Sequence, residues 1–160
     1  MMKWLVSIVV VCSTAAGWCQ TADTIVVLKS KREMQLLSGG KVLRTYKVAL
    51  GSEPVGAKHF QGDHRTPEGV YRIDFRNEHS QYYKALHVSY PNAADRAYAA
   101  KFHNAAGGDI MIHGLPKAYA FVGAAHRLHD WTDGCVAVTD QEMDEIWRLV
   151  PAGVRVEIKP

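Results

Sequence analysis

Short runs in which apolar and polar residues alternate dominate the chain after position 23. Such alternation is typical of strands that bury one face. The predicted strands cover residues 24–28, 33–37, 42–50, 70–75, 86–90, 110–112 and 154–158. Gly39-Gly40 predicts a hairpin turn between the second and third of them, because paired glycines accept the positive φ that such turns need.

Helical periodicity is clear in one segment, residues 139–150. Thr139 and Glu142 fit a capping box, and apolar residues follow from Met143 at i, i+3, i+4 and i+7. Residues 92–102 predict a second, weaker helix, and residues 51–63 read as a polar, glycine-rich loop. Many short strands with few helices predict a mostly β fold, a β-sandwich with helices laid on it, in a single domain over residues 24–160.

The first 19 residues fit a secretory signal peptide. Lys3 gives a positive start, residues 4–12 are an apolar run of nine, and small residues follow, with cleavage expected near positions 17–19. The run is far shorter than the roughly 20 residues that span a bilayer, so no transmembrane segment is expected in the mature chain. A lipoprotein anchor fits less well, since Trp18 precedes Cys19. We expect export, and favour the periplasm.

Composition narrows the class of protein further. At 160 residues and 48% hydrophobic, the chain can bury the core of one ordinary domain. Its net charge is 19 − 16 = +3, and its Lys and Arg residues are scattered rather than clustered, so no nucleic-acid partner is expected.

The cysteines suggest either a packing role or catalysis. Cys12 would leave with the signal peptide, as would Cys19 if cleavage follows it, which leaves Cys135 alone in an oxidising compartment. A buried free cysteine is the simpler interpretation. The alternative is a nucleophile, which needs a base nearby.

His113-Gly114 ends one short predicted strand, and Thr132-Asp133-Gly134-Cys135 opens another. An imidazole that takes the thiol proton would give the attacking thiolate, since a free thiol has a pKa of about 8.5. Gly134 would let a substrate approach closely, and its N–H with that of Cys135 is a candidate oxyanion hole.

These residues belong to a longer pattern that resembles the L,D-transpeptidase (YkuD) catalytic domain. The resemblance runs from Ile25-Val26-Val27-Leu28-Lys29 through Val48-Ala49-Leu50-Gly51 and Arg65-Thr66-Pro67-Glu68-Gly69 to Asp130-Trp131-Thr132-Asp133-Gly134-Cys135. It implies that family's mostly β sandwich. It also implies Cys135 as nucleophile, His113 as general base and the Gly114 carbonyl as the group that orients the imidazole.

The signature departs from the usual Ser/Thr-His-Gly-Cys in two places, which marks a branch of the family. Asp133 stands where the second His is usual, and Ala137 where Asn or Arg is usual. A carboxylate aimed at the sulfur would raise the thiol pKa. We expect Asp133 to turn away or to pair with Arg127.

Other side chains have competing interpretations as substrate-binding or structural. Arg127 is a candidate clamp for a substrate carboxylate or a solvated arginine, and Trp131 a wall of the site or a core aromatic. Thr132 and Asp133 are further candidates beside the thiol, and His87 and Tyr90 are candidates for the donor groove or for core packing.

The histidines raise the question of a metal. His126 and His129, with His113 and Cys135, would suit zinc chemically, but a His-x-x-His pair is common in ordinary loops, so no metal is predicted. His59 and His64 lie in a polar loop and are expected to be solvated.

The resemblance implies an exported L,D-transpeptidase that acts on peptidoglycan stem peptides without a cofactor, with a role in cell-wall organisation and cell shape. Cys135 would form a thioester, resolved by an amine of another stem or by a free D-amino acid. The alternatives are an L,D-carboxypeptidase, in which water resolves the thioester, and a non-catalytic wall- or zinc-binding module.

Overall fold

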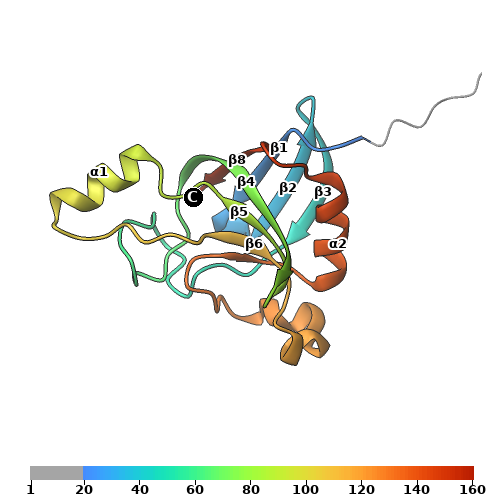
Figure 1. Ribbon diagram of the computed structural model, residues 1–160. Helices are drawn as coiled ribbons and strands as arrows, with labels where there is room; N and C mark the ends of the chain where they lie inside the picture. Colours follow the sequence, from blue (N-terminus) through green and yellow to red (C-terminus); the bar gives the residue numbers. More distant parts are fainter. Residues whose placement is uncertain (1–19) are drawn as a thin grey trace, which may run out of the picture.

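The computed structural model describes residues 20–160, so the predicted signal peptide at residues 1–19 lies outside the described residues. Eight strands form one sheet in the order β3-β2-β1-β8-β4-β5-β6-β7 (Figure 1). The strands are β1 (Thr24–Leu28), β2 (Glu33–Ser38), β3 (Lys41–Lys47), β4 (Gly69–Ser80), β5 (Tyr83–Val88), β6 (Met111–His113), β7 (Val136–Ala137) and β8 (Arg155–Lys159). The prediction of a mostly β fold is confirmed.

The sheet folds over on itself through its longest strand. The first residues of β4 pair with β8, and the register with β5 shifts between Ile73 and Phe75, where β4 passes from one layer to the other. The two outer edges then meet, because Ala49, just after β3, exchanges two backbone hydrogen bonds of 3.0 and 2.9 Å with Ala137 of β7. The last strands are thereby held at both edges.

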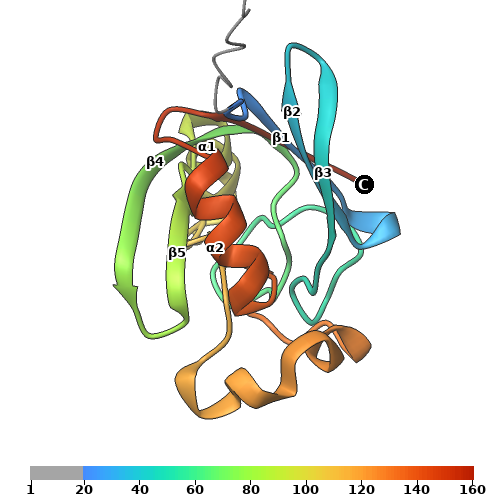
Figure 2. The same ribbon diagram turned by 90° about the vertical axis from the view of Figure 1, so that its right-hand side faces the viewer.

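Helix α2 (Asp140–Leu149) lies between the two layers, as Figure 2 shows. The predicted capping box of Thr139 and Glu142 starts it, and Met143 and Ile146 are fully buried on its inner face. Helix α1 (Ala93–Lys101) lies to one side of the sheet, contributes the buried Ala99 to the core and is capped by Asn92.

Polar side chains tie α2 to both layers. Glu145 accepts a hydrogen bond of 2.9 Å from the Tyr46 hydroxyl of β3, and Asp144 pairs with Lys84 of β5 at 2.7 Å. The helix therefore holds the two layers at a fixed spacing. Strands β6 and β7 lie at the end of the strand order.

Several bounds differ from the sequence prediction: β3 ends at Lys47 rather than at residue 50, and β5 covers Tyr83–Val88 rather than residues 86–90. Two parts of the chain differ more. Strand β4 continues to Ser80, beyond the predicted end at residue 75, because its polar far end is exposed and carries no alternation to signal a strand. Two 3-10 segments, η1 (Lys29–Lys31) and η2 (Lys117–Leu128), were not predicted. Segment η2 is broken at Gly123, whose φ of 51° and ψ of −134° are not helical, so no continuous helical face could form.

A buried lysine orders the loop between β3 and β4. Lys29 Nζ contacts the Gly56 carbonyl, the Thr66 carbonyl and the Glu68 carboxylate at 2.5, 3.0 and 2.8 Å. A buried ammonium is costly unless such partners surround it, so the loop is drawn onto the sheet.

Among residues 20–160, no helix is long and apolar enough to cross a membrane.

Candidate active site

Strands β6 and β7 place Cys135 and His113 on one face of the sheet. The strands are parallel, with His113 paired to Ala137, and Cys135 lies two residues before Ala137. Side chains two apart along an extended chain share a face. Both residues line a cleft with a volume of about 540 Å³.

The His113 ring is buried and held in one tautomer. Its side chain is 3% exposed, and Nδ1 lies 2.7 Å from the Gly114 carbonyl oxygen. A carbonyl only accepts, so Nδ1 carries the proton and Nε2 is left as the acceptor. Burial also lowers the pKa of His113, which keeps the imidazole neutral and able to act as a base.

Gly114 has no room for a side chain. A Cβ there would lie 2.6 Å from Asp140 Oδ1 and 3.1 Å from the Tyr83 Cβ. That same Asp140 oxygen accepts a 2.7 Å hydrogen bond from the Leu115 N–H. The carbonyl beside His113 is therefore set by close packing against α2 and β5.

The Cys135 thiol is held between two backbone groups. The Met111 N–H donates to Sγ at 3.4 Å, and the thiol donates to the Asp109 carbonyl at 3.5 Å. Burial raises the pKa of Cys135, the Met111 N–H lowers it, and the carboxylates of Asp133 and Asp109 raise it again. The resting thiol is thus protonated at neutral pH, and attack requires a base.

A tight turn immediately precedes Cys135. The Thr132 hydroxyl donates to the Cys135 carbonyl at 2.8 Å and accepts from the Gly134 N–H at 3.1 Å. The Gly134 N–H is therefore taken up within the turn, which argues against its predicted place in an oxyanion hole. The role of the Cys135 N–H stays a prediction.

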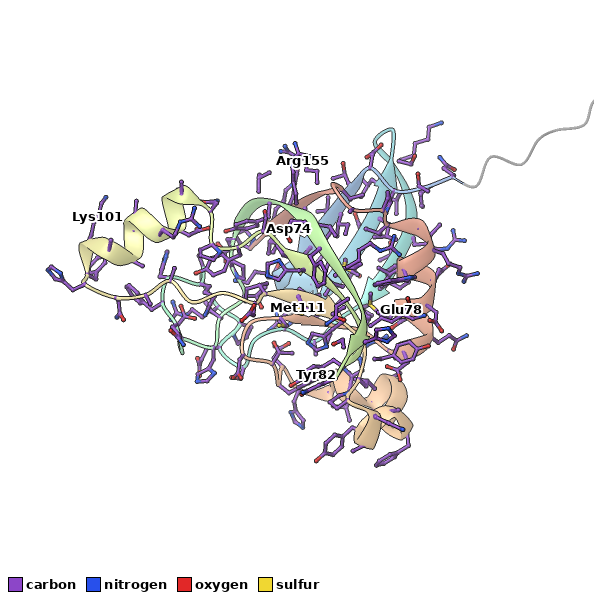
Figure 3. The ribbon with its side chains drawn as sticks, viewed as in Figure 1. Asp74, Glu78, Tyr82, Lys101, Met111 and Arg155 are labelled. Atoms are coloured by element: carbon purple, nitrogen blue, oxygen red, sulfur yellow. The ribbon has the colours of Figure 1, made fainter. Side chains whose placement is uncertain are left out.

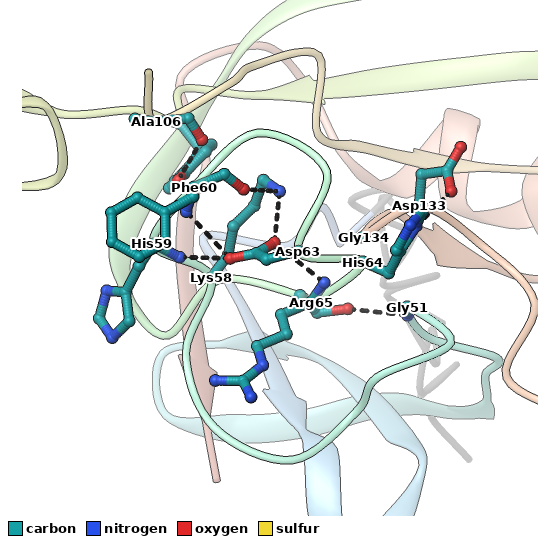
Figure 4. A network of polar contacts seen from close by, with 12 residues as sticks. Gly51, Lys58, His59, Phe60, Asp63, His64, Arg65, Ala106, Asp133 and Gly134 are labelled. Atoms are coloured by element: carbon teal, nitrogen blue, oxygen red, sulfur yellow. Dashed lines mark hydrogen bonds and ion pairs between the residues drawn. The ribbon is translucent and has the colours of Figure 1, made fainter. Parts of the chain in front are cut away.

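Close packing against a neighbouring loop requires glycine at position 134, and the predicted close approach of a substrate stays a prediction. Its φ is +129°, and a Cβ would lie 2.5 Å from the Arg65 carbonyl oxygen. Figure 4 shows how that loop is held: Asp63 pairs with the buried Lys58 at 2.7 Å and accepts from the Phe60 N–H at 2.9 Å. A network of buried polar contacts thus supports the turn before Cys135.

Aromatic rings enclose His113 on its other side. Trp131 lies edge-on to His113 with ring centroids 5.9 Å apart, and Tyr82 lies 4.6 Å from His113. Figure 3 shows Tyr82 at the end of the β4–β5 hairpin, next to η2. Trp131 lines the cleft, as one of its two interpretations expected. Tyr82 was missed, and the only signal for it is an exposed aromatic at a hairpin turn.

The chain is similar to proteins of a known family. Residues 22–158 match the model of the L,D-transpeptidase catalytic domain, YkuD. The chain belongs to this family. The protein of Escherichia coli (strain K12) called "Putative L,D-transpeptidase YafK" is 36% identical over 113 residues, which are 69% of this chain and 38% of that protein.

Solved structures agree on the fold. The helical cell shape determining protein Pgp2 of Campylobacter jejuni has a TM-score of 0.66 at 23% identity, covering 88% of this chain and 48% of that one. Mycobacterium tuberculosis L,D-transpeptidase 1 has a TM-score of 0.52 at 15% identity, covering 86% and 60%. The chain spans about half the length of Pgp2, and less of YafK.

In this member of the family, Asp133 pairs with a residue from another loop. Its carboxylate lies 2.7 Å from His64 Nδ1 (Figure 4), and its side chain is 91% exposed. The predicted pairing with Arg127 is wrong, and His64 is not simply solvated. Residues 64 and 133 are far apart in sequence, so no local pattern could have indicated the contact.

Three predicted substrate-binding residues lie away from the cleft. Arg127 pairs with Glu142 at the start of α2. His87 Nδ1 lies 2.6 Å from Asp74, and the buried Tyr90 hydroxyl donates to a backbone carbonyl at 2.9 Å. None of the three lines the cleft. Tyr90 is buried in the core, as its packing interpretation expected, whereas Arg127 is ion-paired rather than solvated and His87 is half-buried rather than packed in the core.

No metal site is evident in residues 20–160, since no group of three or more His, Cys, Asp or Glu side chains could hold an ion. His126 Nδ1 accepts from the Trp131 indole N–H at 3.3 Å.

Two other predicted substrate-binding residues do line the cleft. Thr132 and Asp133 both lie along it with Cys135.

Proposed function

We propose that the chain is an exported cysteine L,D-transpeptidase that acts on peptidoglycan stem peptides. One observation carries the proposal: Cys135 and His113 share a sheet face and a cleft, and the imidazole has only Nε2 free to take a proton. Family membership supplies the reaction class. The proposed roles are Cys135 as nucleophile, His113 as general base and acid, and the Gly114 carbonyl as the group that orients the ring.

The acylation step begins from a neutral pair. His113 Nε2 takes the thiol proton as Sγ attacks the carbonyl carbon of the donor residue, and the carbonyl electrons move onto oxygen. The Cys135 N–H would stabilise that oxyanion. When the intermediate collapses, the C–N bond breaks, the departing amine takes the proton from His113, and a thioester on Cys135 remains.

Deacylation reverses the proton transfer. An incoming amine loses its proton to His113, attacks the thioester and restores the thiol. A stem-peptide amine would give a cross-link, and a free D-amino acid would give an exchanged stem. Water in the same place would make the protein an L,D-carboxypeptidase, the alternative that uses the same residues.

The N-terminal sequence and the relatives support the setting that we propose for the reaction. A signal peptide at residues 1–19 would carry the chain to the periplasm, where stem peptides are found. The structural neighbour Pgp2 is described as determining helical cell shape, which fits a cell-wall role for this fold.

The test incubates the mature protein with disaccharide-tetrapeptides and a free D-amino acid, with products read by mass spectrometry. Dimers or exchanged stems that are absent with Cys135→Ala would support the transferase, and shortened stems alone would support the carboxypeptidase. Intact substrate with both proteins, and no mass shift on Cys135, would overturn the proposal.

A further inference from the structure

A second cavity adjoins the catalytic cleft on the side of the base. It has a volume of about 410 Å³ and lies against η2, which contributes Tyr119, Val122 and His126 to its wall. Tyr82 and Trp131 line both this cavity and the cleft that holds Cys135. The two spaces therefore meet at the aromatic pair that encloses His113.

A third cavity adjoins the cleft at the opposite end. Its volume is about 330 Å³, and it shares Gly108, Asp109 and Asp133 with the cleft. His64 also lines it. The three hollows thus adjoin in a row, which we call the groove. Asp109, whose carbonyl accepts from the Cys135 thiol, lines its charged end, and the two rings packed against His113 line its apolar end at η2.

The order of these groups assigns a direction to the substrate. Sγ attacks the carbonyl carbon, while the leaving nitrogen must come within hydrogen-bond reach of the base that protonates it. His113 packs against Tyr82 and Trp131, the rings that line the apolar cavity, so the nitrogen side of the cleaved bond points toward that cavity. An attacking amine gives its proton to the same Nε2 and so occupies the same side.

The cavity at that end suits an uncharged apolar group. Its described lining consists of aromatic and aliphatic side chains and one histidine. His126 is 9% exposed, and burial together with the positive charge of Arg127 lowers its pKa to about 4, so it is neutral at neutral pH. A charged side chain would lose its hydration there without gaining a counter-charge.

On this basis, which rests on the proposed function, we propose that the cavity lined by Tyr82, Val122 and Trp131 is the side-chain subsite for the D-amino acid whose amine leaves or attacks. Its size favours an apolar side chain larger than the methyl group of alanine. The volume falls within the range of small-molecule sites, roughly 300–1,000 Å³.

The test uses stem tetrapeptides that differ only in their fourth residue: D-Ala, D-Leu, D-Phe, D-Glu or D-Lys. Release of that residue and the thioester mass on Cys135 are both followed, so the assay works for a transferase and for a hydrolase. We expect kcat/KM for D-Leu and D-Phe to exceed that for D-Ala by about tenfold, since an added methylene in an apolar pocket is worth that much or more. D-Glu and D-Lys should be no better than D-Ala.

Two neighbouring substitutions separate the cavity from η2 as a whole. Val122→Trp fills the cavity and should abolish the preference for D-Leu and D-Phe over D-Ala. Phe121→Trp places the same side chain one position earlier, where Phe121 is 86% exposed and lines no part of the cavity, and should leave the preference unchanged. Val122→Ala, which enlarges the cavity, should keep D-Phe favoured and guards against misfolding of the larger variant.

The outcomes distinguish the two proposals. Equal kcat/KM for all five stems, or a preference for D-Glu or D-Lys, with a thioester still formed on Cys135, would overturn the subsite while leaving the proposed function in place. Absence of both release and thioester with every stem would overturn the proposed function itself.

Discussion

Hydrogen bonds of backbone groups and of a few polar side chains hold the Cys135 end of the groove, whereas packed aromatic and aliphatic side chains form the end at η2. At the first end, the thiol lies between the Met111 N–H and the Asp109 carbonyl, and the turn before it packs against the Arg65 carbonyl. At the second end, Tyr82 and Trp131 contact the base through ring packing alone.

The two ends would meet two different requirements of the proposed acyl-transfer reaction. A nucleophile and a base have to be held within a fraction of an ångström, which backbone bonds on a sheet do well. Selection of a leaving or attacking group needs only a cavity of suitable size and polarity. Substitutions at the first end should cost rate or stability, and those at η2 should change selectivity.

The largest expected effect is at the nucleophile. Cys135→Ala should reduce turnover of a stem tetrapeptide by at least about 10⁴-fold, because removal of a nucleophile abolishes covalent catalysis. Binding of the stem should persist, since the groove is unchanged. Mass spectrometry of products and calorimetric binding measure the two quantities, and turnover by the variant would show that another group attacks.

Replacement of the base should have the next largest effect. His113→Gln should lower kcat/KM by about 10²- to 10⁴-fold, the usual contribution of general acid–base catalysis. His87→Gln, on the partner strand of β6 but outside the cleft, is the matched control and should retain activity.

The pH profile of the wild-type protein checks the same residue. His113 accepts a proton only when neutral, so kcat/KM should fall as the pH drops through its folded pKa. Burial lowers that pKa from 6.5, so the acid limb should lie below pH 6.5. An acid limb above pH 7 would contradict a buried, neutral base.

A fourth prediction concerns the stability of the Cys135 end. Gly134→Ala should destabilise the fold by about 2–4 kcal/mol, because the new Cβ meets the Arg65 carbonyl and the backbone φ is unfavourable. Gly62→Ala, in the supporting loop, also has a positive φ, but nothing lies within 4 Å of its Cβ. It should cost about 1 kcal/mol. Urea unfolding compares the two, and equal losses would show that packing against Arg65 contributes nothing.

The same contrast explains what sequence could predict. Helix α2 and strand β8 were predicted because their apolar periodicity is local and follows directly from burial on one face. Segment η2 carries no such period and is broken at Gly123, so it was missed, and with it the apolar cavity.

For the site, Cys135 and His113 were singled out by residue type and resemblance, and their shared face depends on the parallel pairing of β6 with β7. Contacts between loops that are far apart in sequence could not be predicted from the sequence. Two such contacts depend on a loop without regular structure. They are the pairing of Asp133 with His64 and the packing of Gly134 against Arg65. Arg127 was misassigned because its partner, Glu142, already had a predicted role in the helix cap.

The smallest expected effect tests the charge at the thiol end. Asp133→Asn removes a carboxylate that raises the pKa of Cys135, so the pKa should fall and the thiolate fraction at a given pH below it should rise. Alkylation by iodoacetamide at pH 8 should become a few-fold faster. The shift should stay below about one pKa unit, because Asp133 is 91% exposed and water screens it. Added salt at 0.5 M should shrink the difference between variant and wild type.

Asp74→Asn is the matched control for this last change. Asp74 also pairs with a histidine, His87, at 2.6 Å, but lines no part of the cleft, so alkylation of Cys135 should keep its wild-type rate. Slower alkylation of the Asp133→Asn protein would mean that the His64–Asp133 contact holds the turn in place. In that case an exposed side-chain contact, and not only the buried hydrogen bonds of the turn, would set the geometry of the charged end, and the contrast between the two ends would be weakened.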